Sequence, residues 1–116
     1  MRRKSLDYVN DILTECEYLL KSSVNIEYHQ FIQDENLKRA FVRSLEVIGE
    51  ATKKISPEIK REYQEVPWRD MAGIRDKLIH EYFGVNYAVV WETVIKDIPE
   101  IYRLFREILR KINENY

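Results

Sequence analysis

The chain has 116 residues, a length at which one hydrophobic core is expected and a second domain is not. Its 45% hydrophobic content supplies a core and its 34% charged content keeps the surface wet, which excludes a disordered or fibrous protein. The formal net charge of −1 argues against a protein that binds nucleic acid over its whole surface, so any such site has to be local.

The cysteine content and the amino terminus indicate a cytoplasmic protein. Cys16 is the only cysteine, which excludes an internal disulfide and fits a reducing compartment. The basic start at residues 1–4 is followed by charged and polar residues where a signal peptide needs an apolar run. No stretch is apolar enough to suggest a membrane span, so we expect no membrane partner.

Apolar side chains recur three and four positions apart in the first half of the chain, which is the pattern of amphipathic helices. This pattern predicts a first helix over 5–21, a short second helix over about 26–32 and a long third helix over 37–55. Gly49 lies inside the third helix, where glycine costs stability. We therefore expect close packing of another helix at Gly49.

The middle of the chain carries helix start and stop signals. Ser56 followed by Pro57 is typical of a capped helix start and predicts a short helical connector. A longer helix is expected to begin near Trp68 and to end at the turn around Gly84. This helix would carry the chemically most informative residues of the chain.

Two further helices are expected after that turn. Asn86 is predicted to cap the first of them, and the second begins at Ile98 and continues almost to the end. The core face of the first is assigned to Val90, Trp91, Val94 and Ile95. Since no strand-like alternation is present, the predicted fold is all-α, an antiparallel up-and-down bundle of four main helices with short extra helices, in a single domain over 1–116.

Arg75, His80 and Tyr82 lie within eight residues and combine a permanent cation with a group that titrates near neutral pH. RNA cleavage by its own 2′-hydroxyl needs such a pair, because a proton moves on and off oxygen while charge grows on the phosphate. In a regular helix Arg75 and His80 would lie about 140° apart. Either the helix loosens before His80, or a second chain completes the site across a twofold axis, and we favour the second with help from the first.

The same residues also have purely structural explanations. Arg75 can form an exposed salt bridge with Asp76 or Glu81, and His80 can be a helix-end histidine favoured by the helix dipole. Tyr82 can be a core aromatic residue or can present its hydroxyl at the same groove. Spacing alone leaves these alternatives open.

Other candidate residues are weaker. In a twofold dimer, two copies of Lys77 would add to a positive groove. Glu46 and Glu50 lie one helical turn apart, and they can be either paired carboxylates that act together or a solvated ridge of surface charges. We take Glu50 as a candidate for an interface or for a supporting role at the site. His29 has no cysteine or acidic partner at a recognisable ligand spacing, so we expect neither a metal site nor a cofactor.

Several local signatures occur in order along the chain. They are Ile48-Gly49-Glu50-Ala51, Val66-Pro67-Trp68, Gly73-Ile74-Arg75-Asp76 running into His80-Glu81-Tyr82, and Val85-Asn86 followed by Val90-Trp91. Over nearly its whole length the chain therefore resembles the HepT-like ribonucleases of the HEPN superfamily. These are the toxin halves of prokaryotic toxin–antitoxin pairs whose other half, MntA, is a minimal nucleotidyltransferase.

The resemblance implies a metal-independent endoribonuclease that works as a homodimer and leaves 2′,3′-cyclic phosphate ends. Arg75 and His80 of both subunits would line one cleft, with His80 as general base or acid and Arg75 holding the phosphate of the RNA substrate. We assign supporting roles to Asp76, Lys77 and Glu50.

The resemblance also implies a partner and a means of regulation. The chain would be the toxin of a type VII-like toxin–antitoxin pair, and a cognate MntA-like nucleotidyltransferase antitoxin would transfer AMP onto Tyr82. The added phosphate charge would block RNA by occupation and repulsion. The alternatives are a non-catalytic helical partner or substrate-presenting module of a minimal nucleotidyltransferase, and a dimer that binds RNA without cutting it.

Overall fold

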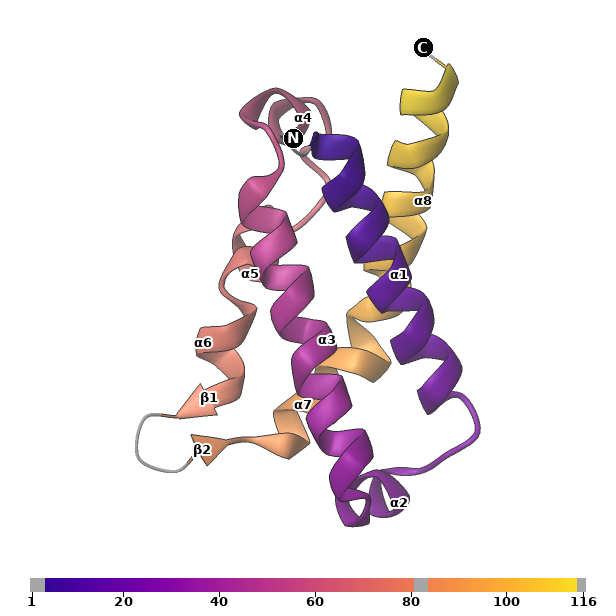
Figure 1. The fold of residues 1–116 in the computed structure, drawn as a ribbon, viewed down its shortest axis with the longest axis vertical. Helices are drawn as coiled ribbons and strands as arrows, with labels where there is room; N and C mark the ends of the chain where they lie inside the picture. Colours follow the sequence, from indigo (N-terminus) through magenta and orange to yellow (C-terminus); the bar gives the residue numbers. More distant parts are fainter. Residues whose placement is uncertain (1–3, 81–83, 115–116) are drawn as a thin grey trace.

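The computed structural model describes residues 4–80 and 84–114, and it confirms the all-α class. The longer helices are α1 (Ser5–Ser23), α3 (Glu35–Lys54), α7 (Tyr87–Lys96) and α8 (Ile98–Glu114). The short helices are α2 (Tyr28–Gln33), α4 (Pro57–Glu62), α5 (Trp68–Ala72) and α6 (Ile74–Leu78). Two strands of two residues, β1 (Ile79–His80) and β2 (Gly84–Val85), complete the described elements (Figure 1).

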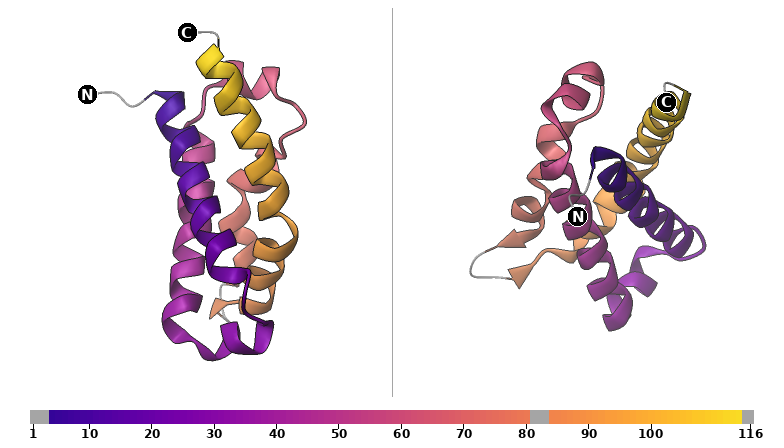
Figure 2. Two further views of the ribbon diagram at one scale, coloured as in Figure 1. Left: turned by 90° about the vertical axis from the view of Figure 1, so that its right-hand side faces the viewer. Right: turned by 45° about the horizontal axis from the view of Figure 1, so that its top comes forward.

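The long helices pack through the apolar stripes that the sequence predicts. Along α1 the buried hydrophobic side chains are Val9, Ile12, Leu13, Cys16 and Leu19. They face α3 and α8, which lie beside α1 in both directions of view (Figures 1 and 2). Each buried aliphatic side chain contributes about 1.5–3 kcal/mol to the free energy of folding. Since most of the buried hydrophobic residues lie on α1, α3 and α8, these three helices supply most of the hydrophobic stabilisation.

A cluster of aromatic rings joins α2 and α3 to α7. The Phe31 ring of α2 lies 5.0 Å from that of Phe41 in α3 and 5.1 Å from that of Trp91 in α7, measured between ring centroids. Phe31 and Phe41 are fully buried. This cluster fixes the end of the molecule where the β1–β2 hairpin and α7 begin (Figure 1).

The prediction of one continuous helix from Trp68 to Gly84 is wrong. The helix breaks at Gly73, which separates α5 from α6, and α6 ends at Leu78. The five-residue segments on either side of Gly73 are too short to carry an apolar stripe along one face, and the sequence pattern did not distinguish them from one long helix.

A small antiparallel hairpin replaces the predicted end of that helix. Ile79 pairs with Val85 and His80 pairs with Gly84, and the Asn86 N–H donates to the Leu78 carbonyl at 2.8 Å. Gly84 has φ +73°, the left-handed region that favours glycine, so it serves the hairpin and does not stop a helix. The prediction that the helix loosens before His80 is confirmed.

The helix caps at Ser56 and Asn86 are confirmed, but one core assignment is not. The Ser56 hydroxyl accepts from the Ile59 N–H, and the Asn86 carboxamide oxygen accepts from the Val89 N–H. In α7 the side chain of Ile95 is 43% exposed, so its assignment to the core face is wrong. Ile95 directly follows the buried Val94, so it falls outside the face of α7 that packs on the core.

Gly49 lies where α3 meets α5 and α6. A Cβ atom at this position would lie 3.0 Å from Ile74 Cγ2 and 3.3 Å from the Met71 carbonyl oxygen. The absence of a side chain therefore allows the α5–α6 segment to approach α3 closely, as the sequence predicts.

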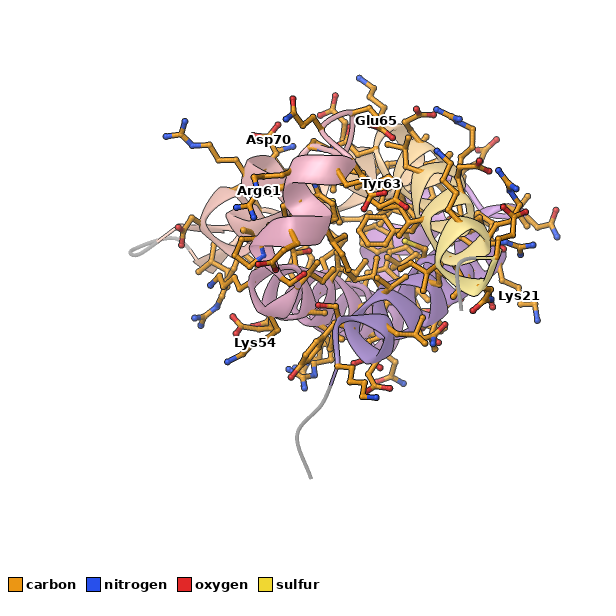
Figure 3. All side chains as sticks on the ribbon, turned by 90° about the horizontal axis from the view of Figure 1, so that it is seen from above. Lys21, Lys54, Arg61, Tyr63, Glu65 and Asp70 are labelled. Atoms are coloured by element: carbon orange, nitrogen blue, oxygen red, sulfur yellow. The ribbon has the colours of Figure 1, made fainter. Side chains whose placement is uncertain are left out.

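Charged side chains surround the bundle. Seen along the long axis, Lys21, Lys54 and Glu65 lie at the edge of the molecule, whereas the Tyr63 ring lies between the helices (Figure 3). Tyr63 is only 4% exposed. Within the described ranges, no helix has the length and apolar character needed to cross a bilayer.

Candidate nuclease site

Arg75 is the best-defined residue of the candidate site. It lies on α6, its side chain is 66% exposed, and its Nε atom lies 3.3 Å from Glu46 Oε2 on α3. The Glu46 side chain is only 27% exposed, so the carboxylate is half-buried and the guanidinium lies on the water side of the pair. Glu46 therefore orients the guanidinium, and among the described residues no other ion-pair partner faces the remaining N–H groups of Arg75, which can bind an anion from solvent.

The position of Arg75 follows from the contact of α6 with α3. Glu46 lies three residues before Gly49, so both are on the same side of α3. Gly49 lets Ile74 pack at short distance, and the next residue, Arg75, then reaches Glu46. The sequence pattern suggests a paired carboxylate or a solvated ridge for Glu46, and for Arg75 it suggests acidic partners close to it in the chain, so this contact is not predicted.

Lys77 does not lie with Arg75. Its Nζ atom is 3.7 Å from Asp97 Oδ2, at the end of α7. Residues two positions apart on a helix are separated by about 200° around its axis, so Arg75 and Lys77 extend to different sides of α6. Asp76 lies between them and is exposed. Within the described part of one chain, no contact between Lys77 and Arg75 supports the predicted role of Lys77.

His80 is placed by the hairpin, not by a helix. The Ile79 N–H still donates to the Arg75 carbonyl, and the chain then continues in extended form into His80. For His80 the backbone alone belongs to the described part of the structure. Tyr82, the predicted acceptor of AMP, lies outside the described residues.

Glu50 pairs with a lysine of its own helix. Its side chain is 62% exposed and its Oε1 atom lies 3.4 Å from Lys53 Nζ on the same helix. The predicted interface or supporting role of Glu50 stays a prediction.

The Cys16 thiol and the His29 imidazole are two other groups that could take part in chemistry, and their surroundings give each a structural explanation. Burial raises the pKa of the Cys16 thiol to about 12, so this thiol is a core group and not a nucleophile. His29 Nδ1 lies 3.5 Å from Glu27 Oε2, and both side chains are largely exposed. Among the described residues, no group of three histidine, cysteine or acidic side chains is arranged to hold a metal ion.

Comparisons with known proteins identify the family of this chain. Residues 12–108, from α1 to α8, match the sequence model of the family described as "Ribonuclease HepT-like". The chain belongs to the HepT-like ribonuclease family. The match includes α6 and the hairpin, so the residues of the candidate site fall inside the family's span.

Curated relatives extend the match to most of the chain. A protein of Caldanaerobacter subterraneus subsp. tengcongensis named "Putative RNase" is 52% identical over 104 residues, covering 90% of this chain and 93% of the relative. A protein of Methanocaldococcus jannaschii that is also named as a putative RNase is 47% identical over 105 residues, which cover 90% of this chain and 87% of the relative. "Probable ribonuclease HepT" of Thermococcus cleftensis is 45% identical and covers 96% of this chain and all of its own. No solved structure matches this HepT-like chain.

Proposed function

We propose that this HepT-like chain is an endoribonuclease that cleaves RNA through Arg75 and His80. The observation that carries the proposal is the exposed guanidinium of Arg75, oriented by Glu46 at 3.3 Å on a helix that ends two residues before His80. The family match over 12–108 and the relatives named as ribonucleases support the same activity. RNA is accordingly the proposed substrate.

The proposed reaction is attack of a ribose 2′-hydroxyl on the adjacent phosphorus. His80 accepts the proton of the 2′-hydroxyl while the 2′-oxygen–phosphorus bond forms. The bond from phosphorus to the 5′-oxygen of the next nucleotide breaks, and that oxygen takes up a proton. The products are a 2′,3′-cyclic phosphate and a 5′-hydroxyl, and no metal ion enters the step.

Arg75 is proposed to bind the non-bridging oxygens of the scissile phosphate. Negative charge builds up on these oxygens in the transition state, and a guanidinium offers two parallel N–H groups that match them. The guanidinium is the exposed member of its pair with Glu46, so its outer N–H groups can bind a phosphate from the solvent side.

A homodimer would supply the second proton-transfer group. One chain has one His80, whereas the reaction needs a base for the 2′-hydroxyl and an acid for the leaving oxygen. A twofold axis beside the hairpin would bring two copies of Arg75 and His80 into one cleft. We therefore include the dimer in the proposal.

The proposed biological role is that of a toxin silenced by its partner. A nucleotidyltransferase antitoxin would transfer AMP from ATP onto the Tyr82 hydroxyl, forming a phosphodiester and releasing pyrophosphate. The added anion, two residues from His80, would occupy the position of the RNA phosphate and repel it. Co-expression with such a nucleotidyltransferase followed by intact-mass spectrometry would detect this adenylate, and it should disappear in Tyr82→Phe.

The nuclease activity is tested with two substitutions and two matched controls. Arg75→Ala and His80→Ala should each lower RNA cleavage by the purified protein about 10²- to 10⁴-fold, since each removes one group from the transition state. The controls are Arg61→Ala and His29→Ala, because both side chains are exposed and paired with acidic residues elsewhere on the surface. They should cleave like the wild type.

Two outcomes would contradict the proposal. Equal cleavage by the site variants and the controls would separate the activity from Arg75 and His80. Intact RNA after long incubation with the wild-type protein, combined with retained binding to a nucleotidyltransferase, would instead support the non-catalytic partner module.

A further inference from the structure

A cavity of about 760 Å³ opens between the α5–α6 segment and the junction of α7 and α8. Its apolar lining comes from Pro67, Met71, Ile74 and Ile101. Met71, Ile74 and Ile101 are almost fully buried, so the lower part of the cavity is an extension of the core surface. The volume lies within the range of small-molecule sites, which are mostly apolar with a few well-placed polar groups.

Thr93 supplies a buried polar group in the wall of this cavity. The residue is 2% exposed, and its hydroxyl has no hydrogen-bond partner among the described residues. By contrast, the buried Thr52 hydroxyl donates to the Ile48 carbonyl at 2.7 Å. A buried hydroxyl without a partner is unfavourable, so a ligand atom that exchanges a hydrogen bond with Thr93 would be selected.

Cationic side chains occur at the rim. Arg69, Lys77 and Lys96 line it together with three acidic residues. Lys77 and Lys96 have carboxylate neighbours, Asp97 at 3.7 Å and Glu92 at 2.5 Å, in pairs that are exposed to water. Exposed pairs exchange partners at small cost, so the two ammonium groups can bind an anionic group of a ligand.

The cavity also adjoins the proposed nuclease site. Lys77 at its rim lies on α6, the same helix that carries Arg75. Since the two side chains extend to different sides of α6, a molecule in the cavity would not occupy the position of the scissile phosphate. A strand that passes over α6 can contact both places.

We propose that this cavity binds one nucleotide, with its base against Met71, Ile74 and Ile101. A polar edge of the base exchanges a hydrogen bond with the Thr93 hydroxyl, and the phosphate lies at Lys77 and Lys96. The inference rests on the proposed function in one respect: the nucleotide is assigned to the RNA strand whose scissile phosphate Arg75 binds. A free mononucleotide has the same chemistry, and the test separates these two sources.

The test measures binding, not cleavage. The probes are the four nucleoside 5′-monophosphates and a short 2′-O-methyl oligoribonucleotide, which lacks the attacking hydroxyl and stays intact. Titration calorimetry or fluorescence anisotropy with the wild type gives the dissociation constants. Binding of the oligonucleotide alone assigns the cavity to the strand, and binding of a monophosphate as well assigns it to nucleotides in general.

Thr93→Val is the central variant, because it removes the hydroxyl and keeps the shape. Affinity for the bound probe should fall about five- to tenfold, the effect of one hydrogen bond, while the unfolding temperature should not decrease. Thr93→Ser should restore most of the affinity. Thr52→Val is the matched control: it loses a satisfied hydroxyl outside the cavity and should bind like the wild type.

A second pair of variants tests the phosphate contact. Lys96→Gln should weaken binding of the probe several-fold and reduce its salt dependence. Lys53→Gln, an exposed lysine on α3 that pairs with Glu50, should change neither.

The result that overturns the inference is unchanged affinity in Thr93→Val and Lys96→Gln, or no binding of either probe at millimolar concentration. RNA cleavage by the wild type in that case would leave the proposed function intact and remove only the cavity from it. Conversely, probe binding that depends on Thr93 in a protein that cuts no RNA would support the nucleotide site and contradict the nuclease.

Discussion

The bundle of α1, α3 and α8 and the segment from α5 to the hairpin are built in different ways. The bundle consists of helices of 19, 20 and 17 residues whose inner faces are continuous apolar stripes. The segment consists of two five-residue helices and two-residue strands, and it presents Arg75 and Lys77 to solvent. Stability therefore resides in the first region, and the candidate chemistry resides in the second.

Several contacts couple the two regions, among them the Trp68–Phe105 ring pair, and one contact also holds the candidate site. Gly49 of α3 faces Ile74 and the Met71 carbonyl, and Glu46 on the same side of α3 holds Arg75. A change at this contact should affect both stability and function, whereas changes further into either region should affect only one. The following predictions test that division, beginning with the largest expected effect.

Truncation of a buried ring should affect the bundle strongly. Phe41 is fully buried, with its centroid 5.0 Å from that of Phe31, so Phe41→Ala should lower the free energy of unfolding by about 3–5 kcal/mol. Arg75→Ala removes an exposed side chain and should change the same quantity by less than about 0.5 kcal/mol. Urea denaturation followed by circular dichroism measures both. A similar loss of unfolding free energy in the two variants would contradict the assignment of stability to the bundle and of chemistry to the α5–hairpin segment.

Filling the contact at Gly49 should disturb both regions. Gly49→Val places carbon atoms against Ile74 Cγ2 and the Met71 carbonyl, so we expect a loss of about 2–3 kcal/mol in unfolding free energy and slower RNA cleavage. The matched control is Gly73→Ala, since a Cβ at Gly73 meets only the Arg69 carbonyl oxygen at 3.4 Å. The control should stay within about 1 kcal/mol of the wild type. Wild-type stability in Gly49→Val would contradict the close approach of α6 to α3.

The hairpin should depend on the backbone of Gly84. This residue has φ +73°, and a Cβ atom placed on it would have no described neighbour within 4 Å. The cost of Gly84→Ala therefore comes from backbone conformation alone, about 1–2 kcal/mol. Gly84→Asn should cost less, because asparagine tolerates left-handed backbone better. Thermal unfolding of the three proteins orders them, and equal losses for alanine and asparagine would refute the explanation.

The smallest effect is expected from the buried thiol. Because burial raises the pKa of Cys16 from 9.0 to about 12, the unfolded chain loses this proton first as the pH rises. The unfolded state then binds fewer protons than the folded state, so stability decreases from about pH 9 upward. At about pH 9.5 the loss should be under about 1 kcal/mol. The stability difference between wild type and Cys16→Ala should narrow accordingly between about pH 8 and 9.5, and a constant difference would contradict this origin.

The sequence predicts the bundle well because its signals are repetitive. The apolar periods of α1, α3 and α8 recur over many turns, and the caps at Ser56 and Asn86 are local patterns of side chain and backbone. The close packing at Gly49 follows from the unfavourable presence of glycine inside a helix. These features need little knowledge of the rest of the fold.

The candidate site could be predicted only in part because its geometry is set by contacts distant in sequence. Arg75 and His80 stand out as neighbours in the chain, but strands of two residues show no alternation, so the sequence predicts a helix end where the hairpin lies. The partner of Arg75, Glu46, lies on another helix, where local spacing gives no signal. The cavity at Thr93 likewise exists only after α5–α6 and α7–α8 have packed.

The most direct measurement is the chemistry of the RNA ends that the purified protein leaves in the presence of EDTA. Mass spectrometry of the fragments should show 2′,3′-cyclic phosphates and 5′-hydroxyls with the wild type, and neither with His80→Ala. Fragments with 3′-hydroxyl and 5′-phosphate ends that form only with a divalent cation, or no fragments from the wild type, would contradict cleavage by Arg75 and His80.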